Sequence, residues 1–268
     1  MKFSILMSLY NNETASNLEE CFCSLYNQSL KAEEVVLVID GPIGSDLLAV
    51  VEKWACFLNI IKVKIDENVG LGKALNHGLK FCKNNYIARM DTDDICFPER
   101  FESQMSYLIK NPELAILGSN IIEFNRSKEL STGVRKVPFA YEDILKYCKF
   151  RNPFNHMSII FNKKIIQEVG GYHHHYFMED YNLWLRVISS GYKVENINKN
   201  LVYARSDSAS IARRRGLKYI ASEYKLALLK AELGIQKKHT ALTYFMLRAT
   251  SRVMPSKLLK LVYNQDRK

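Results

Sequence analysis

Long hydrophobic runs are absent from this chain of 268 residues, although 47% of its residues are hydrophobic. No run approaches the roughly 18 apolar residues that a helix needs to span a bilayer, which excludes an integral membrane protein built on spanning helices. The apolar start, Phe3 to Tyr10, is interrupted by Asn11-Asn12-Glu13 and lacks a small-residue cleavage site. We therefore expect a first strand rather than a signal peptide, and a cytoplasmic protein.

Cysteine pairs of the kind that bind metals are also absent. The six cysteines include no CxxC pair and have no histidine partners at zinc spacing, which argues against a zinc site. We expect reduced thiols in the core, as in a reducing compartment. These cysteines are Cys21, Cys23, Cys56, Cys82, Cys96 and Cys148.

Acidic residues are scarce only in the C-terminal part of the chain. Up to Ala204 there are 23 Lys and Arg against 24 Asp and Glu, whereas from Arg205 onward there are 15 against 4. This basic tail could face nucleic acid, anionic lipid or a phosphorylated substrate. We place a soft boundary near Ser206, with one domain over residues 1–205 and a basic helical extension over residues 206–268.

Apolar strands and amphipathic helices alternate through the first 90 residues. Strands are predicted at Phe3–Leu9, Glu34–Asp40, Ile60–Ile65 and Tyr86–Met90, with helices at Ser16–Gln28, Asp46–Trp54 and Gly72–Cys82 between them. This alternation predicts an open α/β sheet. Polar residues follow each strand, namely Asn11 and Asn12, Asp40, Asn68 and the acids from Asp91. The carboxyl ends of parallel strands share one edge, where such sheets bind ligands.

Three carboxylates stand within four residues, at Asp91, Asp93 and Asp94, before a helix that starts near Pro98. If the turn stays extended, Asp91 and Asp93 point to one side and Asp94 to the other. Convergent carboxylates favour a hard cation such as Mg²⁺ or Mn²⁺, particularly when a diphosphate completes the coordination. The alternative is a solvated acidic turn that caps the following helix.

The second half of the chain contains further strands and helices. Strands are predicted at Ala115–Phe124, Met157–Phe161 and Val194–Tyr203, and helices within Val134–Tyr147, after Asp180, and over Ser210–Leu233 and Thr240–Tyr263. Three consecutive histidines, His173 to His175, cannot all face one ion, so we expect a surface loop there. Neither an internal repeat nor a low-complexity linker is visible in the sequence.

Five segments carry a resemblance to a known family. They are SILMSLYNNE, VIDGP around Asp40, ENVGLGKALNHGL around Asn68, YIARMDTDDICFPERF around Asp91 and GGYHHHYFMEDYNLWLR around Asp180. In this order, over about residues 1–205, they resemble glycosyltransferase family 2, inverting enzymes that include those building bacterial O-antigen and exopolysaccharide repeats. The resemblance implies the GT-A fold, a Rossmann-like, mixed, mostly parallel sheet flanked by helices, here with a C-terminal helical extension.

The resemblance also implies a UDP-sugar donor. The first strand and its loop would hold the nucleotide, Asp40 would bond the base or ribose, and the segment from Asn68 would line the ribose and diphosphate. Gly70 and Gly72 would allow close backbone approach at a helix N-terminus, although an ordinary glycine turn is the alternative. The donor residues so assigned are Leu9, Asn11, Glu13, Asp40, Asn68, Gly70, Lys73, Asp91 and Thr92.

The metal site and the catalytic base follow from the same resemblance. Asp91 to Asp94 match the DxD element, with Asp93 as ligand of Mn²⁺ or Mg²⁺, Asp91 as a partner of ribose or metal, and Asp94 supporting. Arg89 would brace these acids. Glu179-Asp180 match the acidic pair that supplies the base, and an inverting transfer is a single displacement that needs one. We assign Asp180 as the base and Glu179 to acceptor orientation; the alternative is a pair of helix-start acids favoured by the dipole.

Other residues of these segments remain open between function and structure. His156, beside Asn155, falls near the donor sugar in relatives, but a lone histidine is more often structural. Trp184 could offer a face to a sugar or belong to the core. The Arg213-Arg214-Arg215 run could bind an acceptor diphosphate.

A processive QxxRW signature is absent, which favours the addition of a single sugar. We expect a lipid-diphosphate-linked saccharide acceptor and a peripheral position on the inner face of the plasma membrane, with the basic tail against anionic lipid. The alternative for the tail is a helical cover with a solvated basic face. Two alternative functions are a sugar nucleotidyltransferase and a nucleic-acid-binding protein. The chain lacks the activating loop that a nucleotidyltransferase needs, which argues against the first. The acids gathered at one edge of the sheet argue against the second.

Overall fold

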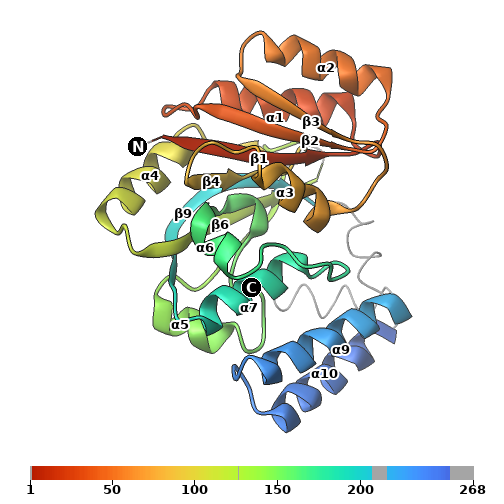
Figure 1. Ribbon diagram of the computed structural model, residues 1–268, viewed down its shortest axis with the longest axis vertical. Helices are drawn as coiled ribbons and strands as arrows, with labels where there is room; N and C mark the ends of the chain where they lie inside the picture. Colours follow the sequence, from red (N-terminus) through yellow and green to blue (C-terminus); the bar gives the residue numbers. More distant parts are fainter. Residues whose placement is uncertain (1, 126, 207–215, 254–268) are drawn as a thin grey trace.

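The computed structural model describes residues 2–125, 127–206 and 216–253, which form one mixed sheet with helices on both faces (Figure 1). The sheet has the strand order β3-β2-β1-β4-β8-β6-β9-β5, and β7 pairs with β6 outside this path. The strands are β1 (Phe3–Leu9), β2 (Glu34–Asp40), β3 (Ile60–Ile65), β4 (Tyr86–Arg89), β5 (Ile95–Cys96), β6 (Leu114–Phe124), β7 (Ser131–Arg135), β8 (Ile160–Asn162) and β9 (Lys193–Arg205).

Strands β1 to β4 run parallel, and the two in the middle of this group, β1 and β2, are buried on both faces. Every residue of β2 is buried. On β1 the side chains alternate, so that Ile5 and Met7 lie in one core cluster and Leu6 in the other. The helices α1 (Ala15–Tyr26), α2 (Ser45–Ala55) and α4 (Arg100–Lys110) cover the first face. The second is covered by α3 (Leu71–Leu79), α5 (Tyr141–Tyr147), α6 (Lys163–Glu168) and α7 (Glu179–Ser189).

The chain reverses its direction of travel across the sheet at β1, which lies between β2 and β4. The connections through α1 and α3 lie on opposite faces, and the loops after β1 and β4 are joined at the carboxyl edge by the hydrogen bond from Thr92 to Glu13. The predicted α/β fold with a mixed sheet is confirmed, and the longer strand pairs, such as β1 with β2 and β6 with β9, are parallel.

Several short elements were not expected from the sequence. Strand β5 has two residues and pairs antiparallel with β9, and β7 lies within a largely exposed segment. The predicted strand at Met157–Phe161 is divided into a 3-10 turn, η1 (His156–Ser158), and β8. The expectation of core thiols is correct for four cysteines but wrong for Cys23 and Cys56, which are exposed.

The C-terminal helices α9 (Leu217–Glu232) and α10 (Lys238–Val253) form a hairpin that packs beside α7 (Figure 1). Tyr219 and Leu226 of α9 join the same core cluster as Trp184 of α7. Among the helices described, each is too short or too polar to cross a bilayer. The predicted helix starting at Ser210 begins at Leu217 in the described part, and the Arg213–Arg215 run lies outside the described residues.

Candidate active site

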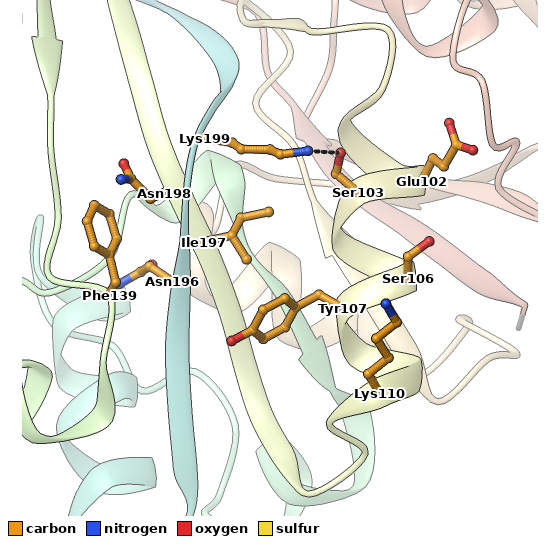
Figure 2. Close-up of a pocket in the computed structure, with 10 residues that line it drawn as sticks. All are labelled: Glu102, Ser103, Ser106, Tyr107, Lys110, Phe139, Asn196, Ile197, Asn198 and Lys199. Atoms are coloured by element: carbon orange, nitrogen blue, oxygen red, sulfur yellow. Dashed lines mark hydrogen bonds between the residues drawn. The ribbon is translucent and has the colours of Figure 1, made fainter.

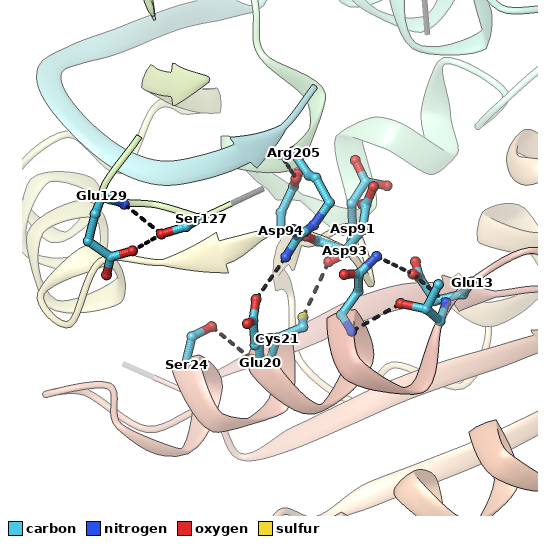
Figure 3. Close-up of polar contacts among 12 residues, drawn as sticks. Glu13, Glu20, Cys21, Ser24, Asp91, Asp93, Asp94, Ser127, Glu129 and Arg205 are labelled. Atoms are coloured by element: carbon cyan, nitrogen blue, oxygen red, sulfur yellow. Dashed lines mark hydrogen bonds and ion pairs between the residues drawn. The ribbon is translucent and has the colours of Figure 1, made fainter. Parts of the chain in front are cut away.

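Three acidic side chains converge in the turn after β4 (Figure 3). One carboxylate oxygen each from Asp91, Asp93 and Asp94 lies within 4.8 Å of the other two. The expectation that Asp94 would point away from the other two acids is wrong, because residues 92–93 form a turn rather than continuing the strand. Three carboxylates, not two, therefore face a common point.

Residues from distant elements hold this acidic turn. Glu13, next to the start of α1, accepts a hydrogen bond from the Thr92 hydroxyl at 2.8 Å. Arg205, at the end of β9, donates from its backbone N–H to Asp94 Oδ1 at 2.8 Å and from Nε to the Asp93 carbonyl at 3.2 Å. Arg89, which is 1% exposed, forms an ion pair with Asp91. The turn is thus fixed by residues from three parts of the chain, and Figure 3 shows the position of Arg205 beside Asp93 and Asp94.

The negatively charged carboxylates of this turn repel one another. Burial, with the charges of Asp91 and Glu13, raises the pKa of Asp93. Burial and the charges of Asp93 and Asp91 raise the pKa of Asp94 well above its usual value. Asp94 Oδ2 is buried and has no hydrogen-bond partner among the described residues. A hard divalent cation prefers carboxylate oxygens and would relieve this repulsion, so the residues present fit such an ion.

Asp40 anchors the loop that leads into α3. Its two carboxylate oxygens accept hydrogen bonds from the backbone N–H groups of Val69, at 2.8 Å, and Gly70, at 3.1 Å. Asp40 is 3% exposed, and the Asn68 amide donates to its carbonyl at 3.2 Å. Gly70 has φ +86°, a conformation that glycine adopts without strain, and its Cα faces open space. The backbone at Gly70, at the N-terminus of α3, is therefore not covered by neighbouring side chains on the side where a Cβ would lie.

The second acidic pair lies at the N-terminus of α7. Asp180 accepts hydrogen bonds from the Asn152 amide at Oδ2 and from the Tyr181 backbone N–H at Oδ1, both at 2.7 Å. Burial raises the pKa of Asp180 in spite of these bonds and of the charges of Arg135 and Arg89. Burial, followed by the charge of Asp180, raises the pKa of Glu179 to about 7. Both groups are therefore stronger bases than ordinary surface carboxylates.

Contacts between these loops join them into one site. A Cβ placed on Gly72 of α3 would lie 3.2 Å from the Cβ of Glu179, so the start of α3 packs directly against the start of α7. The charges of Arg89 and Asp91 both act on the Glu179 carboxyl. Three groups therefore meet at the carboxyl edge of the sheet: the loop held by Asp40, the acids of the turn from Asp91 to Asp94, and the Glu179-Asp180 pair.

The remaining residues assigned from the sequence divide between surface and core. Asn11, Asn68 and Lys73 are exposed at this edge, whereas the Leu9 side chain is fully buried. Trp184 is fully buried, so it belongs to the core and does not offer a face to a sugar. His156 is buried, its Nε2 lies 2.9 Å from the Tyr172 hydroxyl, and burial lowers its pKa well below the usual value.

The histidine run is only partly the surface loop that we expected. His173 and His174 are exposed, but His175 is 6% exposed and hydrogen-bonded through both ring nitrogens. The expectation was wrong for His175 because a helix of the C-terminal extension covers it. The neighbouring residues in sequence gave no sign of this cover.

A separate hollow lies between α4 and β9, away from the acids (Figure 2). It is lined by Glu102, Ser103, Ser106, Tyr107, Lys110, Phe139, Asn196, Ile197, Asn198 and Lys199. Lys199 reaches Ser103 at 3.3 Å, and the Tyr107 hydroxyl donates to Glu195. This lining has no convergent acids, so we do not assign the chemistry to it.

Solved structures of other proteins share this fold. Residues 1–349 of TarS from S. aureus, in complex with UDP-GlcNAc, match with a TM-score of 0.71 at 19% identity, over 92% of this chain and 72% of that chain. The mannosyltransferase PcManGT from Pyrobaculum calidifontis, in complex with GDP-Man and Mn²⁺, gives 0.65 at 16% identity, over 99% and 79%. The chain therefore has a GT-A-like fold.

Sequence comparison gives the family. The model for glycosyl transferase family 2 matches residues 4–170. The amylovoran biosynthesis glycosyltransferase AmsE of Erwinia amylovora is 45% identical over 99% of both chains. The UDP-Gal:alpha-D-GlcNAc-diphosphoundecaprenol beta-1,3-galactosyltransferase of Escherichia coli is 39% identical, over 84% of this chain and 81% of its own length. The chain belongs to glycosyltransferase family 2, and it is an enzyme of that class.

Proposed function

We propose that this enzyme transfers one sugar, with inversion, from a UDP-sugar to a saccharide linked to a lipid diphosphate in bacterial surface polysaccharide biosynthesis. The observation that carries this proposal is the meeting of two acidic groups, Asp91–Asp94 and Glu179-Asp180, at one edge of the sheet, where the charge of Arg89 acts on both. The E. coli relative, whose name gives a UDP-sugar donor and a diphosphate-linked acceptor, supports the substrate classes. AmsE supports the pathway class.

In this proposal the donor is held by the loops after β1, β2, β3 and β4. Asp93 and Asp91 would hold Mn²⁺ or Mg²⁺, with Asp94 in support, and Asp40 fixes the backbone of the loop at Val69 and Gly70 through two hydrogen bonds. Such a cation, when bound, offsets the negative charge that builds on the departing diphosphate. Arg89 fixes the orientation of Asp91 through their ion pair.

Asp180 is the proposed general base. The acceptor hydroxyl attacks the anomeric carbon, its proton passes to the Asp180 carboxylate, and the bond from that carbon to the UDP oxygen breaks with its electron pair on UDP. Asn152 and the Tyr181 N–H each occupy one lone pair of this carboxylate, which leaves others for the hydroxyl. Attack opposite the leaving group converts an α-linked donor into a β product.

The metal assignment is tested by Asp93→Asn. We expect loss of the Mn²⁺-dependent part of UDP binding, because one of three converging carboxylates is removed. The measurement is calorimetric titration of UDP with and without Mn²⁺. Asp143→Asn, on an exposed residue of α5, serves as the matched control and should bind like the wild type. Equal UDP affinity of Asp93→Asn and wild type in Mn²⁺ would refute the placement of the metal.

The base assignment is tested by Asp180→Asn. This variant should still bind UDP in Mn²⁺ but turn over at least about 100-fold more slowly, the usual scale of general-base catalysis. Turnover is measured first with UDP-galactose and a synthetic GlcNAc-diphosphate lipid, then with other UDP-sugars, and the product linkage is determined by NMR. Turnover close to that of the wild type would move the base to another residue.

A further inference from the structure

The loop that delivers the acidic pair has a conformation that needs outside support. Residues 169–178 connect α6 to α7 and lead directly into Glu179-Asp180. Phe177 has φ 59° and is the one non-glycine residue with positive φ among those the structure describes. A bulky aromatic residue is strained in this region, and the strain persists only where surrounding contacts fix the backbone.

Those contacts come from the C-terminal helix α9. The His175 ring lies with Nε2 2.9 Å from the Ser222 carbonyl, and the Ser222 hydroxyl donates to the Tyr176 carbonyl at 2.7 Å. The Tyr219 ring of α9 lies 6.1 Å from the ring of Phe177. One serine of α9 thus bonds two successive residues of the loop, and both residues are within five positions of Asp180.

His175 also connects α9 to the body of α7. Because a carbonyl only accepts, Nε2 carries the proton and Nδ1 accepts from the Asn182 amide at 3.1 Å. Asn182 Oδ1 in turn accepts from Arg186 Nε at 2.9 Å, and Arg186 donates to the carbonyls of Val169 and Gly171 at the start of the loop. The network therefore fixes both ends of the loop.

The charges around His175 are compatible with this neutral ring. Burial lowers the pKa of His175, and the charges of Lys225 and His174 act in the same direction. The hydrogen bond to the Ser222 carbonyl and the charge of Asp180 act against them. The neutral ring can therefore keep a hydrogen bond at each of its two nitrogens near neutral pH.

We propose that His175 and Ser222 are positioning residues for sugar transfer, through which helix α9 holds the acidic pair at the start of α7 in its working geometry. This inference rests on the proposed function of Glu179-Asp180. It gives the C-terminal extension a role inside the active site, beside any role at a membrane. None of the hydrogen bonds of this network comes from the donor loops after β1, β2, β3 and β4, so its loss should affect turnover and leave nucleotide binding intact.

The experiment compares three variants of the full chain. His175→Leu removes both ring bonds, His175→Gln keeps an amide donor at the reach of Nε2, and Ser222→Ala removes only the hydroxyl bond to Tyr176. Ser4→Ala is the control, because Ser4 is a buried serine that donates to Glu34 at 2.7 Å at the opposite end of β1. Each variant is measured for kcat and KM with UDP-galactose and a GlcNAc-diphosphate lipid, for UDP affinity in Mn²⁺, and for thermal unfolding.

We expect kcat of His175→Leu to fall by about 10- to 100-fold, the scale of a displaced catalytic group, with UDP affinity unchanged. His175→Gln should recover most of this loss, and Ser222→Ala should lie between the two. The control should lose thermal stability without a fall in kcat at a temperature where it is folded. Full kcat in folded His175→Leu, equal losses in the Leu and Gln variants, or a parallel loss of UDP affinity would overturn the proposal.

Hydrogen exchange separates this inference from the proposed function. Backbone amides of residues 176–180 should exchange faster in His175→Leu than in His175→Gln, without any substrate present. If the wild type transfers no sugar from any UDP-sugar, the proposed function fails while this measurement still tests the contact. If the wild type is active and both exchange and kcat are unchanged in His175→Leu, the inference alone fails.

Discussion

Glu179 shows, at the scale of single residues, how the site holds carboxylates where their charge is unfavourable. Burial and the adjacent Asp180 raise its pKa to about 7, from an ordinary value of 4.5. In the folded protein the carboxyl therefore keeps its proton over a pH range in which the unfolded chain has lost it. Stability from this group is present below pH 4.5 and is lost as the pH rises through 7.

Glu179→Gln should consequently stabilise the protein in a pH-dependent manner. Gln is neutral at every pH, so the gain over wild type should grow between pH 5 and pH 8, by about 2 kcal/mol. Denaturant unfolding at both pH values measures the difference. Glu142→Gln, on the exposed surface of α5, provides the comparison and should show no such growth. A gain that is the same at pH 5 and pH 8 would contradict the stated cause.

Single residues also mark the limit of what sequence reveals. The pattern of acids after a strand predicted Asp91 and Asp93 as site residues, whereas Asp180 was assigned from the family resemblance. Arg205 was not predicted, because its bonds to Asp93 and Asp94 join residues more than 100 positions apart and depend on the pairing of β5 with β9. Asn152 was missed for a similar reason, since it meets Asp180 only after α5 and α7 have packed.

At the scale of elements, strands with a strong apolar pattern were predicted to within a residue or two, whereas β5 and β7 were not. A two-residue strand has no period, and β7 is mostly exposed. The packing of α3 on the sheet was also hidden from the pattern. A Cβ on Gly78 would lie 2.4 Å from Val38 Cγ2 and 2.8 Å from Leu6 Cδ1, so α3 approaches β1 and β2 more closely than a larger residue permits.

Gly78→Ala should therefore destabilise the fold, although alanine favours helices. Forcing a methyl group against Val38 and Leu6 should lower the free energy of unfolding by about 1–3 kcal/mol. Chemical denaturation measures this change. Gly133→Ala, where a Cβ would meet nothing within 4 Å, should stay within about 0.5 kcal/mol of the wild type. A neutral Gly78→Ala would show that α3 can shift without loss.

At the scale of the whole molecule, the two sides of the C-terminal extension differ in packing and in charge. Its inner side shares the core of α7 through Tyr219 and Leu226. Its outer side carries exposed lysines and exposed apolar residues, including Leu217 at 84% and Leu247 at 65% exposure. We propose that this outer side attaches the enzyme to the anionic cytoplasmic face of the membrane. The exposed lysines described are Lys218, Lys225, Lys237 and Lys238.

Vesicle binding tests this attachment. With a net charge of +10, the protein should sediment with vesicles that contain anionic phospholipid at low ionic strength. Release is expected at about 1 M salt, where the Debye length falls to roughly 3 Å. Vesicles of neutral phosphatidylcholine are the control. Equal sedimentation with both kinds of vesicle, or none with anionic ones at low salt, would argue against attachment by charge.

The bonds from Arg205 to the acidic turn can form only late in the synthesis of the chain. Asp94 and Arg205 are 111 positions apart, a stretch that a ribosome takes on the order of 10 s to translate. Until then the turn lacks these two bonds. The acidic turn can therefore reach its final set of contacts only after the last strand of the sheet has been made.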